Sequence, residues 1–249
     1  MSSKLPTIEE RRRLSSPAAT PQALAWHAGV LWMGSRDLCR IYAIDPETWT
    51  VLEEKEAPGI PWAAVARNGE LRFTIGEGVD DARYIYRYMP GAGFSKLFAC
   101  PDFTGSYLSY DSQHLYLSQW YQQRILKFDA NGNILRHIDI GAEICGHTFV
   151  DGLLYVLRGT ENVPRPPYAQ GPPTAARFRS GAKQGNEQWW IARLNPREER
   201  PEIVDIAKVA FASRSLTFDG ENFWSNHRAA NEIVSFRLPT ESKKWGLQI

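Results

Sequence analysis

Three ionisable side chains stand where they could move a proton. His147 follows a glycine at the start of a β-rich run, His227 lies in a polar stretch after another such run, and Glu77 precedes Gly78 at a strand end. Imidazole titrates near neutral pH, and a carboxylate can act as a base or hold a cation. We therefore take His147, His227 and Glu77 as the candidate catalytic residues.

Each of these residues also has a purely structural interpretation. A histidine that begins an inner strand can be a well-packed lining residue, and Glu77 can be a solvated loop carboxylate. Cys145 lies two residues before His147, and alternate residues of a strand point the same way, so a thiolate–imidazole pair is compatible with strand geometry. The sequence shows no third group to orient such a pair. Asp80 and Asp81 favour an ordinary turn over a divalent cation site.

A second set of residues suits ligand binding. Arginine forks match carboxylate and phosphate groups, and aromatic walls with a few polar groups are typical of small-molecule sites. The residues expected to hold the ligand are Arg158, Arg214, Trp62, Trp120, Tyr121 and Gln119. A wider ring at the same level includes Tyr107, Cys145 and Arg228. Buried arginines that satisfy backbone carbonyls are the alternative.

The element that would position these residues is a repeated phrase of two β-rich runs around a polar turn. It occurs at residues 23–32, 63–73, 107–116, 147–155 and 215–224. The first four copies are spaced by about 40 residues, which with four strands per unit is the period of a β-propeller. We predict an all-β fold, a single five-bladed propeller with four antiparallel strands in each blade.

The last spacing is longer by about 28 residues, and a Pro/Gly-rich insertion at 159–187 accounts for it. The insertion joins the second and third strands of blade 4, so we expect a lid over the face where the innermost strands begin. A surface insertion or an oligomer contact is the alternative. The predicted domain is residues 22–249, preceded at 1–21 by an arm or a short helix near 7–14. Either the segment 244–249 or the N-terminal segment can supply the outer strand of the last blade.

Composition narrows the function classes. The formal charge of +1 gives no reason to expect nucleic acid, and no apolar run approaches the about 20 residues of a membrane span. Three cysteines without a C-x-x-C pair argue against a disulfide framework or a structural zinc site. With no secretory signal visible, we expect a cytoplasmic protein. Phosphate-loop, dinucleotide, zinc-protease and hydrolase-elbow motifs are absent.

Two stretches resemble known propeller families. Residues 216–225 with 231–236 look like a blade of the streptogramin lyase and NHL-type propellers. Residues 22–26 with 40–48 are similar to a blade of the bacterial glutamine cyclotransferases, which are five-bladed. The cyclotransferase pattern places a glutamate at a central blade start, where this chain has Trp62 and no carboxylate. The lyase pattern has a channel histidine, for which His147 or His227 would stand, and its glutamate-bearing loop maps loosely onto Glu77.

These observations lead to two expectations for function. The first is a small-molecule enzyme of lyase or cyclising-transferase type, with its site at the channel mouth under the 159–187 loop. The second is a non-catalytic propeller that binds a protein, peptide or metabolite on the same face. The sequence does not define a cofactor; a divalent cation near Glu77 is the one candidate. A small-molecule ligand is the expected partner, and a protein partner stays open.

Overall fold

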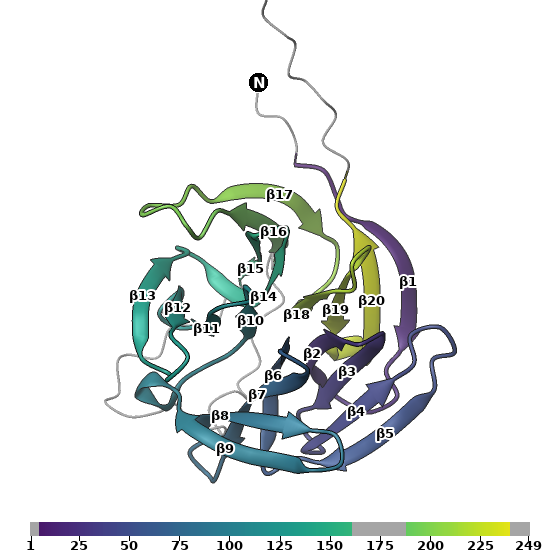
Figure 1. Ribbon diagram of the computed structural model, residues 1–249. Helices are drawn as coiled ribbons and strands as arrows, with labels where there is room; N and C mark the ends of the chain where they lie inside the picture. The colour runs from purple at the N-terminus through teal and green to yellow at the C-terminus, as the bar shows by residue number, and fades with distance from the viewer. Residues whose placement is uncertain (1–4, 161–187, 240–249) are drawn as a thin grey trace, which may run out of the picture.

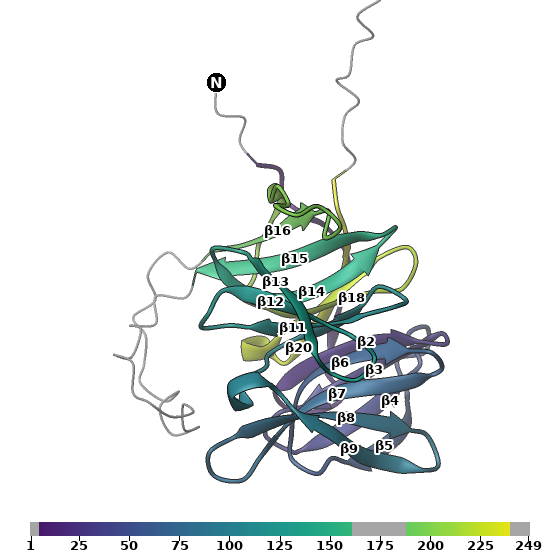
Figure 2. The ribbon, with the colours of Figure 1, turned by 60° about the vertical axis from the view of Figure 1, so that its left-hand side comes forward.

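The computed structural model describes residues 5–160 and 188–239, and it is a ring of five four-stranded antiparallel sheets (Figure 1). The prediction of a five-bladed β-propeller is therefore confirmed. Neighbouring strands of a blade run side by side in opposite directions, as β14 and β15 show in Figure 2. In each blade the first strand lies next to the central axis and the last lies on the rim.

The strand bounds follow the repeated phrase. Blade 1 contains β2 (Pro21–His27), β3 (Val30–Ser35), β4 (Arg40–Ile44) and β5 (Val51–Glu56). Blade 2 contains β6 (Ile60–Arg67), β7 (Glu70–Glu77), β8 (Ala82–Met89) and β9 (Gly93–Ala99). Blade 3 contains β10 (Leu108–Tyr110), β11 (Leu115–Gln119), β12 (Arg124–Phe128) and β13 (Ile134–Asp139). Blade 4 contains β14 (Glu143–Val150), β15 (Leu153–Thr160), β16 (Gln188–Leu194) and β17 (Val204–Val209). Blade 5 contains β18 (Ser213–Phe218), β19 (Phe223–His227), β20 (Glu232–Arg237) and β1 (Glu9–Ser15). Two 3₁₀ turns, η1 (Pro101–Phe103) and η3 (Arg228–Ala230), lie in loops.

The N-terminal segment closes the ring. Strand β1 pairs antiparallel with β20, from Glu9 opposite Arg237 to Ser15 opposite Glu232. The expected short helix near 7–14 is wrong, because the free edge of β20 takes up these backbone groups in a ladder. Of the two segments proposed for the outer strand of blade 5, the N-terminal one therefore fills that place.

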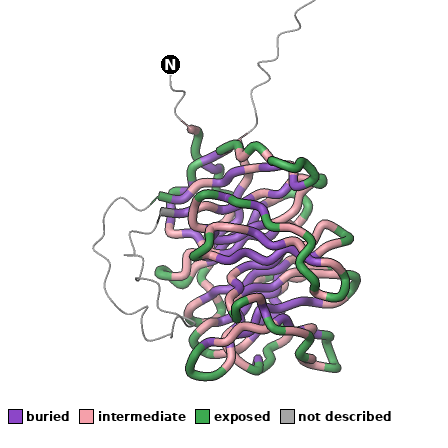
Figure 3. The backbone as a smooth tube through the Cα atoms, turned by 90° about the vertical axis from the view of Figure 1, so that its left-hand side faces the viewer, coloured by how far each residue is buried: buried purple, intermediate pink, exposed green. Residues whose placement is uncertain are grey.

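Hydrophobic residues fill the five seams, a seam being the contact between two neighbouring blades. Successive side chains of a strand point to opposite faces, so each strand feeds two seams. In β7, Phe73 packs among blade 1 residues, whereas Arg72 and Thr74 face blade 3. Figure 3 shows the result: buried backbone runs through the interior of the ring, and exposed backbone is confined to turns and the rim.

The predicted lid at 159–187 falls almost entirely outside the described residues, which stop at Thr160 and resume at Gln188. Positions 159 and 160 belong to β15. Within the described ranges, no helix is long and apolar enough to cross a membrane.

Candidate functional site

Irregular starts of the innermost strands build the candidate site. The register shifts by one residue near the start of β2, β6 and β14, and the extra residues are Gln22, Trp62 and Cys145. A β-bulge of this kind twists the strand and re-aims a side chain. These three residues occupy equivalent places in blades 1, 2 and 4. We call the end of the ring where the innermost strands begin the mouth.

Gln22 is the hub of the mouth. Its side chain is 1% exposed and joins four blades. Nε2 donates to the Trp62 carbonyl at 3.2 Å and to the Tyr107 hydroxyl at 3.3 Å, while Oε1 accepts from Arg228 Nη1 at 2.6 Å. The Gln22 carbonyl accepts from Asn226 Nδ2 at 2.9 Å. Because every polar atom of the amide is engaged, the orientation of Gln22 is fixed.

Two arginines bring positive charge to the mouth. Burial and, second to it, the nearby charge of Arg214 together lower the pKa of Arg228 to about 10. Arg214 donates to Cys145 Sγ at 3.4 Å and to the Ser213 carbonyl at 3.0 Å. Among the residues that the structure describes, no carboxylate lies within ion-pair distance of Arg228. Arg228 therefore brings a positive charge into a partly buried place, where its attraction for an anion is stronger than in water.

Tyr107 contributes a hydroxyl donor between these groups. The residue is 7% exposed, and burial raises the pKa of its phenol. The charge of Arg214 lowers this pKa, but burial has the larger effect. The phenol is therefore protonated at neutral pH. Its oxygen accepts from Gln22 Nε2, so its proton is left to donate. Burial also raises the pKa of the Cys145 thiol, which argues against a thiolate nucleophile there.

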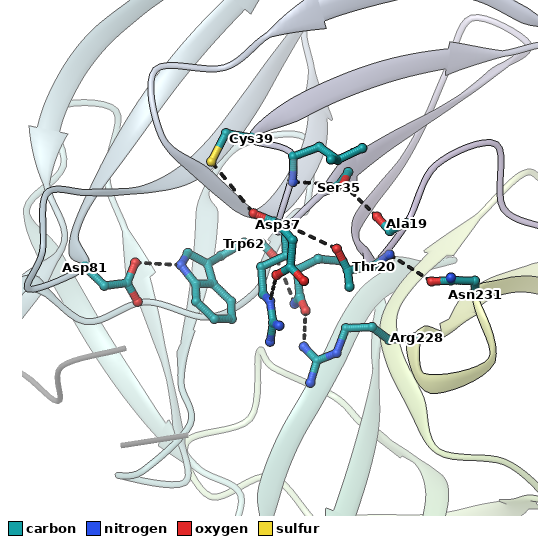
Figure 4. A network of polar contacts seen from close by, with 12 residues as sticks. Ala19, Thr20, Ser35, Asp37, Cys39, Trp62, Asp81, Arg228 and Asn231 are labelled. Atoms are coloured by element: carbon teal, nitrogen blue, oxygen red, sulfur yellow. Dashed lines mark hydrogen bonds and ion pairs between the residues drawn. The ribbon is translucent and has the colours of Figure 1, made fainter. Parts of the chain in front are cut away.

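Trp62 is held rigidly at the edge of the mouth. Its Nε1 donates to Asp81 Oδ1 at 2.8 Å, and the Arg83 guanidinium lies 4.0 Å from its ring centroid. A Cβ at Gly76 would collide with Asp81, so glycine is required there. In Figure 4 Trp62 reaches in from one side and Arg228 from the other, with Thr20 and Asp37 of blade 1 between them.

His147 lies on β14 beside the start of β10, and both of its ring nitrogens have partners. It is 1% exposed, with Nδ1 2.6 Å from Ser109 Oγ and Nε2 3.1 Å from the Tyr107 carbonyl. The carbonyl can only accept, which assigns the proton to Nε2 and makes Ser109 the donor to Nδ1. Burial lowers the pKa of His147 to about 3. His147 is a neutral bridge between β14 and the start of β10.

His227 and Glu77 lie elsewhere and do not join His147. His227 Nδ1 contacts Glu232 at 3.2 Å and Arg13 at 3.3 Å, toward β20 and β1. Glu77 accepts from the Tyr86 hydroxyl and from Lys96 Nζ at 2.6 Å, toward the rim strand β9. The hydrogen bonds from Lys96 and Tyr86 outweigh burial and lower the pKa of Glu77. The contacts of the described residues therefore do not bring His147, His227 and Glu77 together at one point.

The remaining predicted binding residues divide into three groups. Arg158 forms an ion pair with Asp205 at 2.8 Å, and its guanidinium lies 5.4 Å from the Trp190 ring, so it is engaged within blade 4. Gln119 is 1% exposed and fixes the turn at 101–104 through the Pro101 carbonyl at 3.1 Å. Trp120 and Tyr121 pack against each other in the loop after β11, with ring centroids 4.5 Å apart and ring planes tilted by 59°. Arg214 and Trp62 are the predicted residues that reach the mouth network.

The contacts of the acidic residues show whether they are arranged to hold a divalent cation. Asp81 is committed to Trp62 and to Arg83, whose Nη2 lies 3.0 Å from it. Among residues 5–160 and 188–239, no group of three histidine, cysteine or acidic side chains is arranged to hold a metal ion.

Gln22 is the functional residue that sequence reasoning missed. Tyr107 and Arg228 are predicted only as members of the wider ring, not among the candidate catalytic and ligand-holding residues. The available signal was polarity: Gln22 is an amide that opens an otherwise apolar innermost strand, in the repeat position of Trp62. Such a residue must find buried partners, and three other blades supply them.

Comparison with known proteins is consistent with the fold. No protein-family model and no curated protein matches the sequence. Solved structures do resemble it. A glutaminyl cyclase from Myxococcus xanthus aligns over 95% of this chain and 98% of its own, with a TM-score of 0.62 and 10% identity. An aldose sugar dehydrogenase from Streptomyces coelicolor, with bound PQQ, aligns over 95% and 100%, with a TM-score of 0.60 and 13% identity. A streptogramin B lyase aligns over 95% and 100%, with a TM-score of 0.54 and 13% identity. The fold defines the chain as a five-bladed β-propeller similar to these proteins, and at such identities the likeness extends to fold alone.

Proposed function

We propose that the mouth of this propeller binds a small molecule through an anionic group, a carboxylate or a phosphate. One observation carries the proposal. The part-buried guanidinium of Arg228 is bonded to the neutral amide of Gln22, stands near a second cation at Arg214, and forms no ion pair in the described part of the chain, although the charge of Asp37 acts on it from a distance. A part-buried cation that no carboxylate contacts directly is costly, and a bound anion would offset that cost.

The activity that we favour for this site is that of a lyase or a cyclising transferase. Enzymes with this fold are among the structural neighbours, which include a glutaminyl cyclase and a streptogramin B lyase. The supporting observation within the site is Tyr107, a protonated phenol whose proton is available next to two arginines. Such a group can donate a proton to a leaving or attacked atom of a substrate held by the arginines. His147, Glu77 and His227 have no role in this proposal.

The first test is binding. Citrate and inorganic phosphate at constant ionic strength should raise the melting temperature of the wild type above that in chloride. Arg228→Gln should weaken the affinity about 10- to 100-fold, since a charged hydrogen bond contributes about 1.5–3 kcal/mol. Arg40→Gln is the matched control, because Arg40 is an exposed partner of Glu54 in blade 1. Equal responses in Arg228→Gln and the control would refute the site.

The second test separates enzyme from binding module. Cyclisation of an N-terminal glutaminyl peptide and opening of a streptogramin B ring are the two reactions that the neighbours' names suggest. Tyr107→Phe should lower kcat by about 100-fold or more for a true substrate while leaving KM nearly unchanged. A variant that binds anions normally and has unchanged turnover would exclude Tyr107 as the acid. Anion binding without turnover of either probe would favour the alternative, a propeller that binds a metabolite on the same face.

A further inference from the structure

One repeat position departs from the pattern of the other blades. This position lies on the second strand of each blade, and the strand pairing with the first strand defines it in every blade. The residues there are Trp32, Arg72, Tyr116, Tyr155 and Trp224. In four blades this aromatic residue contacts a ring of the next blade, with centroid distances of 5.5, 4.9, 5.3 and 6.2 Å. Blade 2 places an arginine there instead, so the seam between blades 2 and 3 is built differently.

Arg72 is buried but incompletely bonded. Its exposure is 8%, and its Nη2 meets Glu70. Nε and Nη1 are also buried, and within residues 5–160 and 188–239 neither has a hydrogen-bond partner. Thr74, two residues along β7 and on the same face, has a buried hydroxyl that is likewise unpartnered in these ranges. A buried donor left unpaired is destabilising, so the positions of Arg72 and Thr74 favour a further acceptor in this seam.

The charge around Arg72 indicates what kind of acceptor fits. Arg87 sits directly opposite Arg72 on β8, and Arg67 ends the neighbouring strand β6. Glu70 is the one carboxylate in this group, and its Oε2 is 3.9 Å from Arg87 Nε. Burial lowers the pKa of Arg72. The charge of Glu70 raises it, and the charges of Arg67 and Arg87 lower it, with a lower pKa as the net result. Three guanidiniums around one carboxylate leave an excess of positive charge.

The neighbouring blade shapes this place from the other side. Tyr110 of β10 packs against the Arg67 guanidinium, with Arg67 Cζ 5.4 Å from the Tyr110 ring centroid. The Tyr110 hydroxyl lies 3.3 Å from Asn68 Oδ1. Arg67 is the last residue of β6 and Asn68 follows it, whereas the mouth is formed where β6 begins. We call this group the base cluster, comprising Arg67, Glu70, Arg72, Arg87 and Thr74. Arg67, Glu70 and Arg87 lie toward the opposite end of the strands from Gln22, and Thr74 lies farther along β7, opposite Ala63.

We propose that the base cluster is a second binding site, which takes a small oxyanion such as phosphate or a carboxylate between Arg72, Arg87 and Thr74. An oxyanion presents several acceptor oxygens, which match the planar donors of a guanidinium and a hydroxyl. The unpaired Nε and Nη1 atoms of Arg72 then gain acceptors, and the excess charge is neutralised. This site is independent of the mouth and does not rest on the function proposed there.

The test uses the full chain with the mouth disabled by Arg228→Gln, so that only the base cluster responds. Inorganic phosphate and acetate are titrated separately against chloride at equal ionic strength, and the melting temperature is measured. A bound anion at tenfold its Kd should raise the melting temperature by about 3 °C or more. A larger shift with phosphate identifies a phosphate site, and a larger shift with acetate identifies a carboxylate site.

Variants of the cluster decide the outcome. Arg87→Gln changes a half-exposed side chain and should fold, while Arg72→Tyr restores the aromatic residue of the other blades. Both should lose the shift, and the control Arg40→Gln should keep it. Because phosphate also stabilises proteins through exclusion from their surface, only the difference from the control counts. Shifts in Arg87→Gln and Arg72→Tyr equal to the control, or no shift in the parent protein, would overturn the proposal and indicate bound water at Arg72.

Discussion

A side chain's chemistry in this protein is decided by its partners, which the sequence does not display. His147 has the right residue type and the right place in its blade, yet Ser109 and the Tyr107 carbonyl use both of its ring nitrogens. Glu77 likewise ends in an ion pair with Lys96 on the rim. Residue type and repeat position predicted Trp62 and Arg214 at the mouth. They could not predict Gln22, because its role depends on groups from three other blades that meet only after the ring closes.

The neutral state of His147 makes a prediction about pH. Its folded pKa of about 3 lies below the value of 6.5 expected when unfolded, so the unfolded chain binds more protons between these values. The resulting stability is complete above pH 6.5 and is lost as the pH falls toward 3. Between pH 7 and pH 5, the wild type should lose about 2 kcal/mol more unfolding free energy than His147→Gln.

Urea unfolding at several pH values measures this difference. His137→Gln is the control, because His137 is exposed on the rim strand β13. At pH 7 His147→Gln itself should cost about 1–3 kcal/mol, since its partners are left unpaired. Parallel pH profiles for the wild type and His147→Gln would show that His147 is not neutral in the folded protein.

At the scale of elements, the repeat predicted most strands but not the one that closes the ring. The blade phrase combines apolar alternation with a turn, which is a local signal. Strand β1 gives no such signal: Glu9, Arg11 and Arg13 are exposed, and its partner β20 lies more than 200 residues away. Its contribution is nevertheless specific. Trp49 Nε1 donates to the Ser15 carbonyl at 2.8 Å, and the Trp49 ring stacks on Trp224, which joins blade 5 to blade 1.

Removal of β1 should therefore open the ring. A chain lacking residues 1–16 leaves β20 with an unpaired edge, which invites aggregation and removes the lock on the seam. We expect loss of the cooperative thermal transition, together with association on size exclusion. Arg11→Ala is the control, because its exposed ion pair with Glu9 contributes less than about 1 kcal/mol. A truncated monomer with an unchanged melting temperature would mean that β1 is dispensable.

At the scale of the molecule, closure makes the five blades depend on one another. Each seam holds its own hydrophobic cluster, and the innermost strands adjoin in sequence around the axis. An open array of repeats can fray from its ends. A ring closed between β1 and β20 has no such end, so the loss of any seam should expose the others. Sequence predicted the number of blades, but this coupling is a property of the closed chain.

Two buried thiols can measure that coupling. Cys100 lies in the seam between blades 2 and 3, and Cys145 in the seam between blades 4 and 5. Burial raises the pKa of both thiols, that of Cys100 to about 12, so they should react with a thiol reagent only when a seam opens. In Cys39→Ser/Cys145→Ala only Cys100 remains, and in Cys39→Ser/Cys100→Ala only Cys145 remains. Labelling in urea below the midpoint should give each thiol an opening free energy equal to the global value of its own variant, within about 1 kcal/mol. If either thiol reacts through an opening several kcal/mol cheaper than global unfolding, that seam opens alone and the ring does not unfold as a unit.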